Sequence, residues 1–408
     1  MKVMIVNKFH YVRGGAEKNA LQIGELLEKK GHEVMHFSMH HPQNIKYKFS
    51  RFFAEYIDFP EEMKKKSLGS KAKVLRRVFY STDARKKFCE ALNFFQPDII
   101  HLHNIHRHLT ISIIREAYKR KIPMVWTLHD YQLICPNHVM LSHGNVCERC
   151  KHNYLAPILE RCIKDSLLPS VVSATERISN DLQGLGKMIT TFISPSRFLM
   201  NKYLEFGYDK NKFTVISNYY EKPGKSSMPA KDRYFLYLGR LSREKGIPTL
   251  CQAAKEAGVK LKIVGNGPLL DDLSGRYKSD KISFLGYKQG KELENLRSGA
   301  WFTIVPSECY ENNPFSAIES LGDGTPVIGA RIGGIPELIQ DSKTGFLFES
   351  RSVKDLKEKI LCAEKMTVKN RREMGSAAIL FIKRECSEKG YFTKLMKTYK
   401  KTIEEYRR

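Results

Sequence analysis

Residues 1–37 read MKVMIVNKFHYVRGGAEKNALQIGELLEKKGHEVMHF, and this stretch decides the fold class. The β-favouring run Val3–Val6 predicts a short strand, and the pair Gly14–Gly15 predicts the turn that follows it. Apolar residues then recur at helical spacing as far as Gly31, where a left-handed cap is expected and Glu33 opens the next strand. A strand, a helix and a second strand in this order predict a parallel sheet that is covered on both faces.

The same rhythm continues through the chain in two sections that a linker separates. Residues 221–229 are rich in turn formers and have no periodicity, which is typical of a linker. We therefore predict an α/β protein with two doubly wound Rossmann-like parallel-sheet domains that face a central cleft. The predicted domains are residues 1–220 and 221–384, and a C-terminal helix over about 385–408 is a candidate to pack back on the first domain.

The composition favours polyanionic partners. The chain of 408 residues has a formal net charge of +25, and its densest basic run is Lys64–Arg77. This run is either a solvated helix face or a patch for an anionic membrane surface, and no nucleic-acid-binding module frames it, so no nucleic-acid partner is expected. Because neither a secretion signal nor an apolar run of about 20 residues is found, we expect a cytoplasmic protein, peripheral at the inner face of the cell membrane.

Four of the nine cysteines form a cluster with a C-x2-C pair at its centre. Four thiolates can surround a zinc ion tetrahedrally, so the cluster predicts a structural zinc site, and three nearby histidines could substitute as ligands. A set of buried or redox-idle thiols is the alternative, and the long outer spacings do not decide between the two. The residues concerned are Cys135, Cys147, Cys150 and Cys162, with His138, His143 and His152.

Residues 306–319, PSECYENNPFSAIE, carry the pattern that is richest in chemistry. Pro314 suits the first turn of a helix, which would place Glu311 in the preceding loop and Glu319 inside the helix. The free backbone N–H groups at such a helix start bind anions, so they suit a diphosphate. A carboxylate within the helix can accept hydrogen bonds from ribose hydroxyls, although two spaced glutamates alone would more often be ordinary surface residues.

This segment resembles the E-x7-E motif of glycosyltransferase family 4, a group of retaining, nucleotide-sugar-dependent enzymes with the GT-B fold. Further motifs stand in the family's order, and the likeness covers essentially the whole chain. It is weakest between about residues 40 and 95 and beyond 365. The other matching segments are Gly14–Glu17, Leu128–Asp130, Gly239–Gly246, Gly324–Ile328, Gly333–Glu337 and Thr344–Leu347.

The resemblance implies a role for each matching residue. Glu311 would contact the sugar ring, Glu319 the ribose, and His129 the transferred sugar. A departing diphosphate gains negative charge, for which Arg240 offers a planar fork and Lys245 a mobile point charge. The implied catalytic residues are His129, Arg240, Lys245 and Glu311, and the implied donor-binding residues are Gly14, Gly15, Gly239, Asn312, Asn313, Pro314, Phe315 and Glu319.

Two segments depart from the family pattern. Asn312–Asn313 replaces the usual glycine and aliphatic residues after the first glutamate, and Ile216–Tyr220 replaces the commoner P-N-G turn. Both departures leave the identity of the donor open. No two aspartates have D-x-D spacing, so we predict catalysis without a metal or other cofactor.

The predicted activity is retaining transfer of a hexose or N-acetylhexosamine from a UDP- or GDP-linked donor. The acceptor would be a polysaccharide or a lipid-linked oligosaccharide of the cell envelope. A nucleotide-sugar epimerase on the same scaffold is one alternative, and it would need no acceptor. A non-catalytic basic binding protein is another, but such a protein would have no need for Arg240, Lys245, Glu311 and Glu319.

Overall fold

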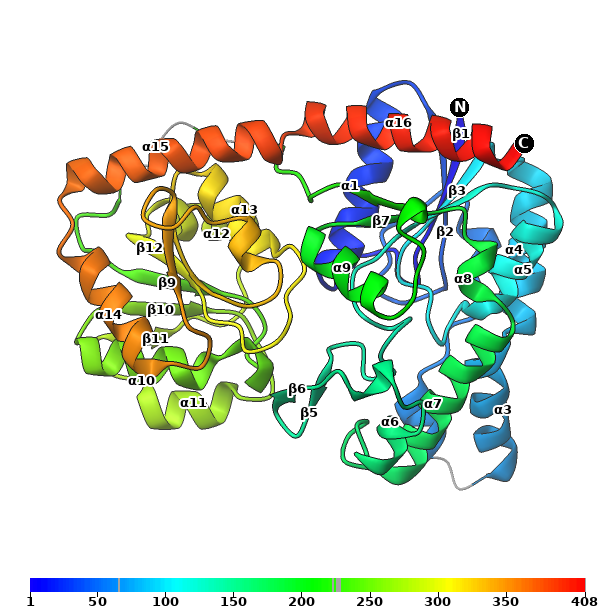
Figure 1. Cartoon of the computed structure of the whole chain (residues 1–408), viewed down its shortest axis with the longest axis horizontal. Coiled ribbons are helices and arrows are strands. Elements are labelled where there is room, and N and C mark those ends of the chain that lie inside the picture. Colours follow the sequence, from blue (N-terminus) through cyan, green and yellow to red (C-terminus); the bar gives the residue numbers. More distant parts are fainter. Residues whose placement is uncertain (65–66, 222–223, 225–228, 408) are drawn as a thin grey trace.

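The computed structural model describes residues 1–64, 67–221, 224 and 229–407. Most of the predicted linker at 221–229, and Lys65 and Lys66 of the basic run, lie outside the described residues. The predicted fold class is confirmed: two parallel sheets, each with helices around it, stand side by side (Figure 1). In the described part of the chain, no helix is both long enough and apolar enough to cross a membrane.

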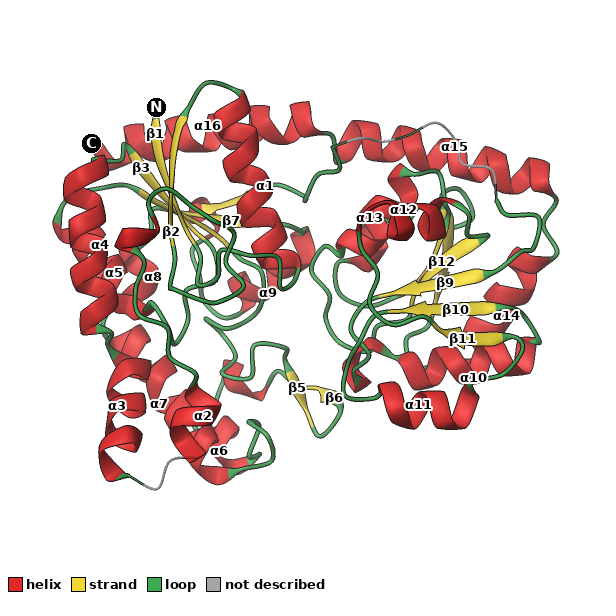
Figure 2. Cartoon of the chain, turned by 180° about the vertical axis from the view of Figure 1, so that it is seen from behind, coloured by secondary structure: helices red, strands yellow, loops and turns green. Residues whose placement is uncertain are grey.

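The first sheet has six parallel strands in the order β2-β1-β3-β4-β7-β8 (Figure 2). Strand β1 lies inside this sheet because its side chains are apolar on both faces, and Val3 to Val6 are fully buried. The strands are β1 (Lys2–Val6), β2 (Glu33–Phe37), β3 (Ile99–Leu102), β4 (Met124–Thr127), β7 (Thr191–Ser194) and β8 (Phe213–Val215). The helices of this half are α1 (Gly15–Lys29), α2 (Phe59–Lys64), α3 (Leu68–Phe79), α4 (Thr82–Phe95), α5 (Thr110–Lys119), α6 (Ala156–Leu159), α7 (Leu167–Leu182), α8 (Leu185–Met188) and α9 (Arg197–Glu205).

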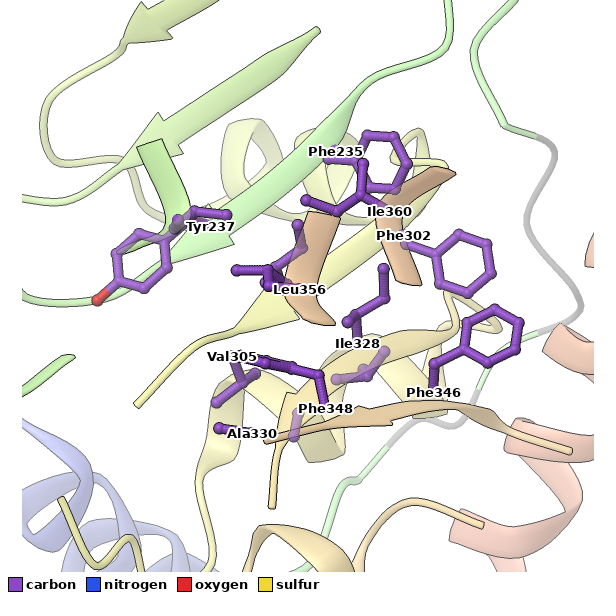
Figure 3. Close-up of a cluster of buried hydrophobic side chains, with 14 of the residues drawn as sticks. Phe235, Tyr237, Phe302, Val305, Ile328, Ala330, Phe346, Phe348, Leu356 and Ile360 are labelled. Carbon is purple, nitrogen blue, oxygen red and sulfur yellow. The ribbon is translucent and has the colours of Figure 1, made fainter. Parts of the chain in front are cut away.

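The second sheet repeats the design with six parallel strands in the order β11-β10-β9-β12-β13-β14. Its core contains Phe235, Phe302 and Phe346 from three strands and Leu356 and Ile360 from a covering helix (Figure 3). The strands are β9 (Phe235–Leu238), β10 (Leu261–Val264), β11 (Ile282–Phe284), β12 (Phe302–Val305), β13 (Val327–Ala330) and β14 (Gly345–Phe348). The helices are α10 (Ile247–Ala257), α11 (Leu270–Tyr277), α12 (Gly290–Ser298), α13 (Phe315–Gly322), α14 (Val353–Glu364) and α15 (Val368–Glu385).

The last helix, α16 (Glu388–Arg407), continues from α15 and lies against the first half (Figure 1). Tyr391, Leu395 and Tyr399 are buried in one core with residues of β1 and α1. The Tyr399 hydroxyl is 2.6 Å from Nδ1 of His101 on β3, so the helix is tied to the sheet by a polar contact as well. The final segment of the chain therefore completes the core that the first segment began.

The chain passes between the halves twice, and the two crossings lie side by side. The backbone N–H of Tyr220 donates to the carbonyl of Cys386 at 2.9 Å. Tyr219 belongs to the core of the first half, whereas Tyr220 packs on the core of the second. The crossing at 220 and the crossing at 386 thus form one connection between the two halves.

Leu395→Ala should destabilise the first half by about 2–5 kcal/mol, because Leu395 is fully buried and its loss leaves a cavity between α16 and the sheet. Lys397→Ala is the matched control on the exposed side of α16 and should change stability by no more than about 0.5 kcal/mol. Urea unfolding followed by circular dichroism measures both. Equal midpoints for the two variants would show that α16 adds nothing to the first half.

Candidate functional site

A cavity of about 470 Å³ lies between the two halves. It is lined by residues that directly follow strands: Asn104 after β3, His129 after β4, Gly239 after β9 and Ser307 after β12. Because all strands of a parallel sheet end at the same edge, these loops face one another across the gap. Of the predicted site residues, those lining the cavity are Gly15, His129, Gly239, Arg240, Lys245, Glu311, Asn312, Asn313, Pro314 and Phe315; Gly14 and Glu319 are not among its lining residues.

Lys245 and Glu311 form an ion pair inside the cavity. Burial disfavours charge on both side chains, but their mutual attraction prevails, so the pKa of Lys245 is raised and the pKa of Glu311 is lowered. The Ser307 hydroxyl also donates to the Glu311 carboxylate at 2.8 Å. Both groups are therefore charged at neutral pH, and the carboxylate is held in place from two sides.

The loop that carries Lys245 needs glycine at position 246. Gly246 has a φ of +68°, and a Cβ there would come within 1.9 Å of the Pro306 carbonyl oxygen. The loop after β9 can therefore press directly against the loop after β12, which brings Lys245 to Glu311. Arg240 lies on the same loop, exposed and at the edge of the cavity, and we find no ion pair for it among the described residues.

Glu319 lies inside α13, as predicted, and is 7% exposed. Pro314 is the residue that caps this helix, not a residue of its first turn, because its backbone is still extended. The buried Arg297 donates to Glu319 Oε2 at 2.5 Å and to Asp323 at 2.5 Å. Lys18 of α1, from the other half, completes the group through an ion pair with Glu319 Oε1.

His129 follows β4 and is half-buried at the cavity wall. Its Nε2 is 2.9 Å from Nδ1 of His103, which follows the neighbouring strand β3. Burial lowers the pKa of His129 to about 4, although the nearby carboxylate of Asp130 opposes this shift. His129 is therefore a neutral imidazole at physiological pH.

The two segments that depart from the family pattern meet each other in the structure. Asn313 accepts hydrogen bonds from Asn218, at 2.8 Å from the backbone N–H and at 2.9 Å from the side-chain amide. Asn312 donates from its amide to the carbonyl of His129 at 2.6 Å. The side chains of Asn312 and Asn313 thus connect the halves, in addition to lining the cavity.

Several residues of the site escaped the sequence analysis. The Glu337 carboxylate accepts from the backbone N–H groups of Arg197 and Phe198, at 2.9 and 2.7 Å, and so caps helix α9 across the gap. Lys18, Arg297 and His103 were missed as well. Glu337 ends the matching segment Gly333–Glu337, but a sequence motif does not reveal a hydrogen-bond partner 140 residues away.

The cysteine cluster lies in a loop with a small hairpin, β5 (Leu141–Ser142) and β6 (Asn145–Val146), which reaches the second half (Figure 1). Arg351 donates to Asn145 at 2.6 Å, and the Tyr310 hydroxyl donates to Glu148 at 2.7 Å. The neighbouring Cys150 thiol, together with burial, raises the pKa of Cys135, while the Cys162 sulfur lies 4.0 Å from the Ser142 hydroxyl.

Metal-ligand geometry is not preformed in this loop. Within the described ranges, no three His, Cys, Asp or Glu side chains are grouped closely enough to hold a metal ion. His138 lines the cavity, and His143 and His152 lie at the surface. The structural zinc at Cys135, Cys147, Cys150 and Cys162 stays a prediction.

The loop after β1 contributes Tyr11, Val12 and Arg13 to the lining of a second hollow, of about 550 Å³. The Tyr11 and His41 rings stack with centroids 4.8 Å apart, and Tyr56 packs edge-on against His41 at 4.8 Å. Arg13 also lines this hollow, and Tyr287, which is 63% exposed, lines it from the second half. Aromatic rings beside hydrogen-bonding groups are a surface on which sugar rings can stack.

Comparison with known protein families finds a glycosyltransferase model for each half of the chain. The sequence model of Glycosyltransferase Family 4 matches residues 13–220, and that of Glycosyl transferases group 1 matches residues 219–381. The two matched ranges adjoin at residues 219–220, where the chain first crosses from one half to the other.

Individual relatives are distant but cover most of the chain. An uncharacterized 42.6 kDa protein in the cps region of Klebsiella pneumoniae is 25% identical over 83% of this chain and 87% of its own. The N-acetyl-alpha-D-glucosaminyl L-malate synthase of Bacillus anthracis is 22% identical, over 82% of this chain and 81% of its own. HepE of Anabaena, solved with UDP and glucose, superposes with a TM-score of 0.69 at 15% identity, over 98% of this chain and 100% of its own.

The match to the family model over half of the chain supports transfer over the epimerase and binding-protein alternatives. With its two facing parallel sheets and with strand-end loops that bring Lys245, Glu311 and His129 into one cavity, the chain belongs to glycosyltransferase family 4 and has the GT-B fold.

Proposed function

We propose that the chain is a retaining hexosyltransferase that transfers a hexose or N-acetylhexosamine from a nucleotide-diphosphate sugar to a glycan acceptor. One observation carries the proposal: Arg240 and Lys245 line the same cavity as Glu311 and His129. Cationic groups are thereby placed before the reaction where a diphosphate would gain charge as it leaves. In this proposal residues 221–384 bind the donor, and residues 1–220 bind the acceptor.

The start of α13 suits the donor diphosphate, since Pro314 and Phe315 line the cavity and the first N–H groups of a helix are free to bind anions. Glu319 would take the ribose hydroxyls. Its Oε2 is held by Arg297, whereas Oε1 is held by Lys18 from the other half. The ribose would therefore displace Lys18 while Arg297 keeps the carboxylate in place.

We propose transfer without a metal and with retention of the anomeric configuration. The acceptor oxygen would bond to the anomeric carbon as the bond from that carbon to the diphosphate oxygen breaks, and the acceptor proton would pass to a phosphate oxygen. Lys245 and Arg240 would neutralise the leaving diphosphate. Glu311, one of the two carboxylate residues among the described residues that line the cavity, is bound by Lys245 and Ser307 and so is a poor nucleophile for a double displacement; the other is Asp130.

UDP is our first candidate for the donor nucleotide and GDP the second, because HepE, which has the same fold, was solved with UDP and glucose. For the acceptor we propose a polysaccharide or lipid-linked oligosaccharide of the cell envelope. The relative in the Klebsiella cps region and the hollow with Tyr11, His41 and Tyr287 support a sugar acceptor. A nucleic-acid partner is not proposed.

A lipid-linked acceptor would require contact with a membrane, and we propose a peripheral location at the inner face of the cell membrane. Helix α6 packs against α7 in the first half (Figure 1), and four exposed leucines on or next to these two helices make up what we call the apolar ridge. Exposed leucines in a group are unusual on a soluble surface and mark an interaction site. The ridge consists of Leu155, Leu159, Leu167 and Leu168, which are 56%, 72%, 52% and 62% exposed, and the exposed Arg161 and Lys164 lie between them in the sequence.

Lys245→Ala should slow nucleotide release from the correct sugar donor by about 100- to 1,000-fold, as expected for the loss of one group that stabilises the leaving charge. Release from UDP-glucose, UDP-N-acetylglucosamine and GDP-mannose is measured with and without membrane extract as the acceptor source. Lys255→Ala, an exposed lysine on α10, is the control and should leave the rate unchanged. If Lys245→Ala with Glu311→Gln restored the rate, Lys245 would serve only to balance Glu311, and the proposed mechanism would be wrong.

Glu319→Gln should weaken binding of the donor nucleotide by about 10- to 100-fold, because a charged acceptor for the ribose hydroxyls becomes neutral. Calorimetric titration with UDP and with GDP measures this loss. Asp323→Asn disturbs the same arginine without touching the ribose position, so it should keep the affinity within about threefold of wild type. Equal losses in both variants would mean that Glu319 acts only through Arg297.

Leu159→Ser combined with Leu168→Ser should reduce binding to vesicles of phosphatidylcholine and phosphatidylglycerol by at least about tenfold, because two apolar side chains can no longer enter the bilayer surface. Flotation of the vesicles measures bound protein. Leu182→Ser is the control: Leu182 is 84% exposed but stands at the other end of α7, about 21 Å from Leu168 along the helix. Equal binding by wild type and the double variant would refute the membrane contact.

A further inference from the structure

His103 is enclosed between two other histidine rings. Strands β3 and β4 are neighbours, so His103 and His129 come out of the sheet side by side. The His103 ring stacks on His129 with centroids 5.2 Å apart, and on His101 with centroids 4.4 Å apart. Its carbonyl accepts from the Trp126 indole N–H at 2.8 Å. His103 is fully buried and has no room to turn.

The contact between His103 and His129 joins two neutral rings. Burial is the main cause that lowers the pKa of both, well below the usual value for His103 and to about 4 for His129. A neutral imidazole has one N–H and one bare nitrogen. In the 2.9 Å contact between His103 Nδ1 and His129 Nε2, one nitrogen must donate and the other must accept.

The surroundings of Nε2, the other ring nitrogen of His103, indicate whether His103 or His129 is the donor in this contact. Nε2 of His103 is buried and has no hydrogen-bond partner in the described part of the chain. If Nε2 carried the proton, a buried N–H would be left without an acceptor, and orphaned N–H groups are rarer in proteins than orphaned acceptors. The proton therefore belongs on Nδ1 of His103, which donates to Nε2 of His129.

The tautomer of His103 also determines which nitrogen of His129 carries a proton in the cavity. His129 accepts on Nε2, so its own proton must be on Nδ1. We find no protein partner for His129 Nδ1 within the described ranges, and this nitrogen is not among the buried atoms that lack a hydrogen bond. Since His129 lines the cavity, Nδ1 is the ring nitrogen that a ligand there can reach.

We propose that His103 is a positioning residue that holds His129 as the Nδ1-protonated tautomer, so that His129 donates a hydrogen bond to an oxygen of the transferred sugar. The role of the donated bond rests on the proposed function, whereas the tautomer does not. A neutral donor also leaves the diphosphate to Arg240 and Lys245, because an imidazolium would compete with them for the negative charge. The sugar must accordingly present an oxygen with a free lone pair at this point of the cavity.

The tautomer can be read without any substrate. Long-range ¹H–¹⁵N correlation spectra of the full-length protein, labelled with ¹⁵N-histidine, distinguish protonated from bare ring nitrogens. The His129 signals are those lost in His129→Gln. We expect a neutral His129 with the proton on Nδ1 in the wild type. A wild-type His129 with the proton on Nε2 would overturn the proposal.

Two variants of His103 test whether it sets this tautomer. His103→Ala removes the donor and leaves room for a water beside Nε2 of His129, so His129 should shift to the Nε2-protonated form, which then donates to that water. His103→Asn places an amide N–H where Nδ1 was, so it should keep the wild-type pattern. An unchanged His129 pattern in His103→Ala would refute the role. If that variant does not fold, the wild-type and His103→Asn spectra still decide the question, and loss of the Nδ1 proton in His103→Asn would count against it.

Kinetics separate positioning from structural support. His103→Ala should lower kcat for nucleotide release by about tenfold, as expected for the loss of one hydrogen bond to the sugar, with His103→Asn within about threefold of wild type. Titration with UDP should give the same affinity in all three proteins, because UDP lacks the sugar that His129 contacts. A parallel loss of UDP affinity would mean that His103 only supports the fold of the cavity. Failure of the proposed function would show instead as no nucleotide release in the wild type.

Discussion

The ion pair between Lys245 and Glu311 is the interaction on which the rest of the cavity depends. It holds the loop after β9 against the loop after β12, and Gly246 allows that approach. The second loop is in turn held by Gly334, whose N–H donates to the Glu311 carbonyl at 2.6 Å. Glu337, three residues after Gly334, caps helix α9 in the other half. The ion pair is thereby the first link in a series of contacts that runs from the loop after β9 to helix α9 in the other half.

The fold could be predicted from the sequence because its signals are local. The strand, glycine turn and helix at Val3–Gly31 follow from spacing over a few residues, and the same pattern recurs in both halves. The cavity residues on strand-end loops could be predicted for a related reason, since parallel strands end at one edge. Lys245, Glu311 and His129 were therefore found together.

The rest of the site depends on partners that are distant in sequence, and no local pattern encodes such pairs. Lys18 and Glu319 are 301 residues apart, and Arg297 looks like any other arginine of a polar helix until its two carboxylates are seen. Asn312 and Asn313 were recognised as departures from the family pattern, but their use as links to His129 and Asn218 could not be read from the sequence. The spacing of apolar residues along the sequence predicts the edge of the sheet at which a side chain lies, but it does not predict which side chain from a distant segment contacts it there.

The position of α16 has a consequence for how the molecule is made. Tyr391, Leu395 and Tyr399 belong to the same core as Val3 and Ile5, so the first half lacks part of its interior until α16 has been synthesised. On the ribosome that half must wait, with apolar surface uncovered, while the intervening half emerges and folds by itself. Successful biogenesis therefore depends on the late arrival of α16, and a nascent chain that stalls before this helix emerges would be the species most in need of a chaperone.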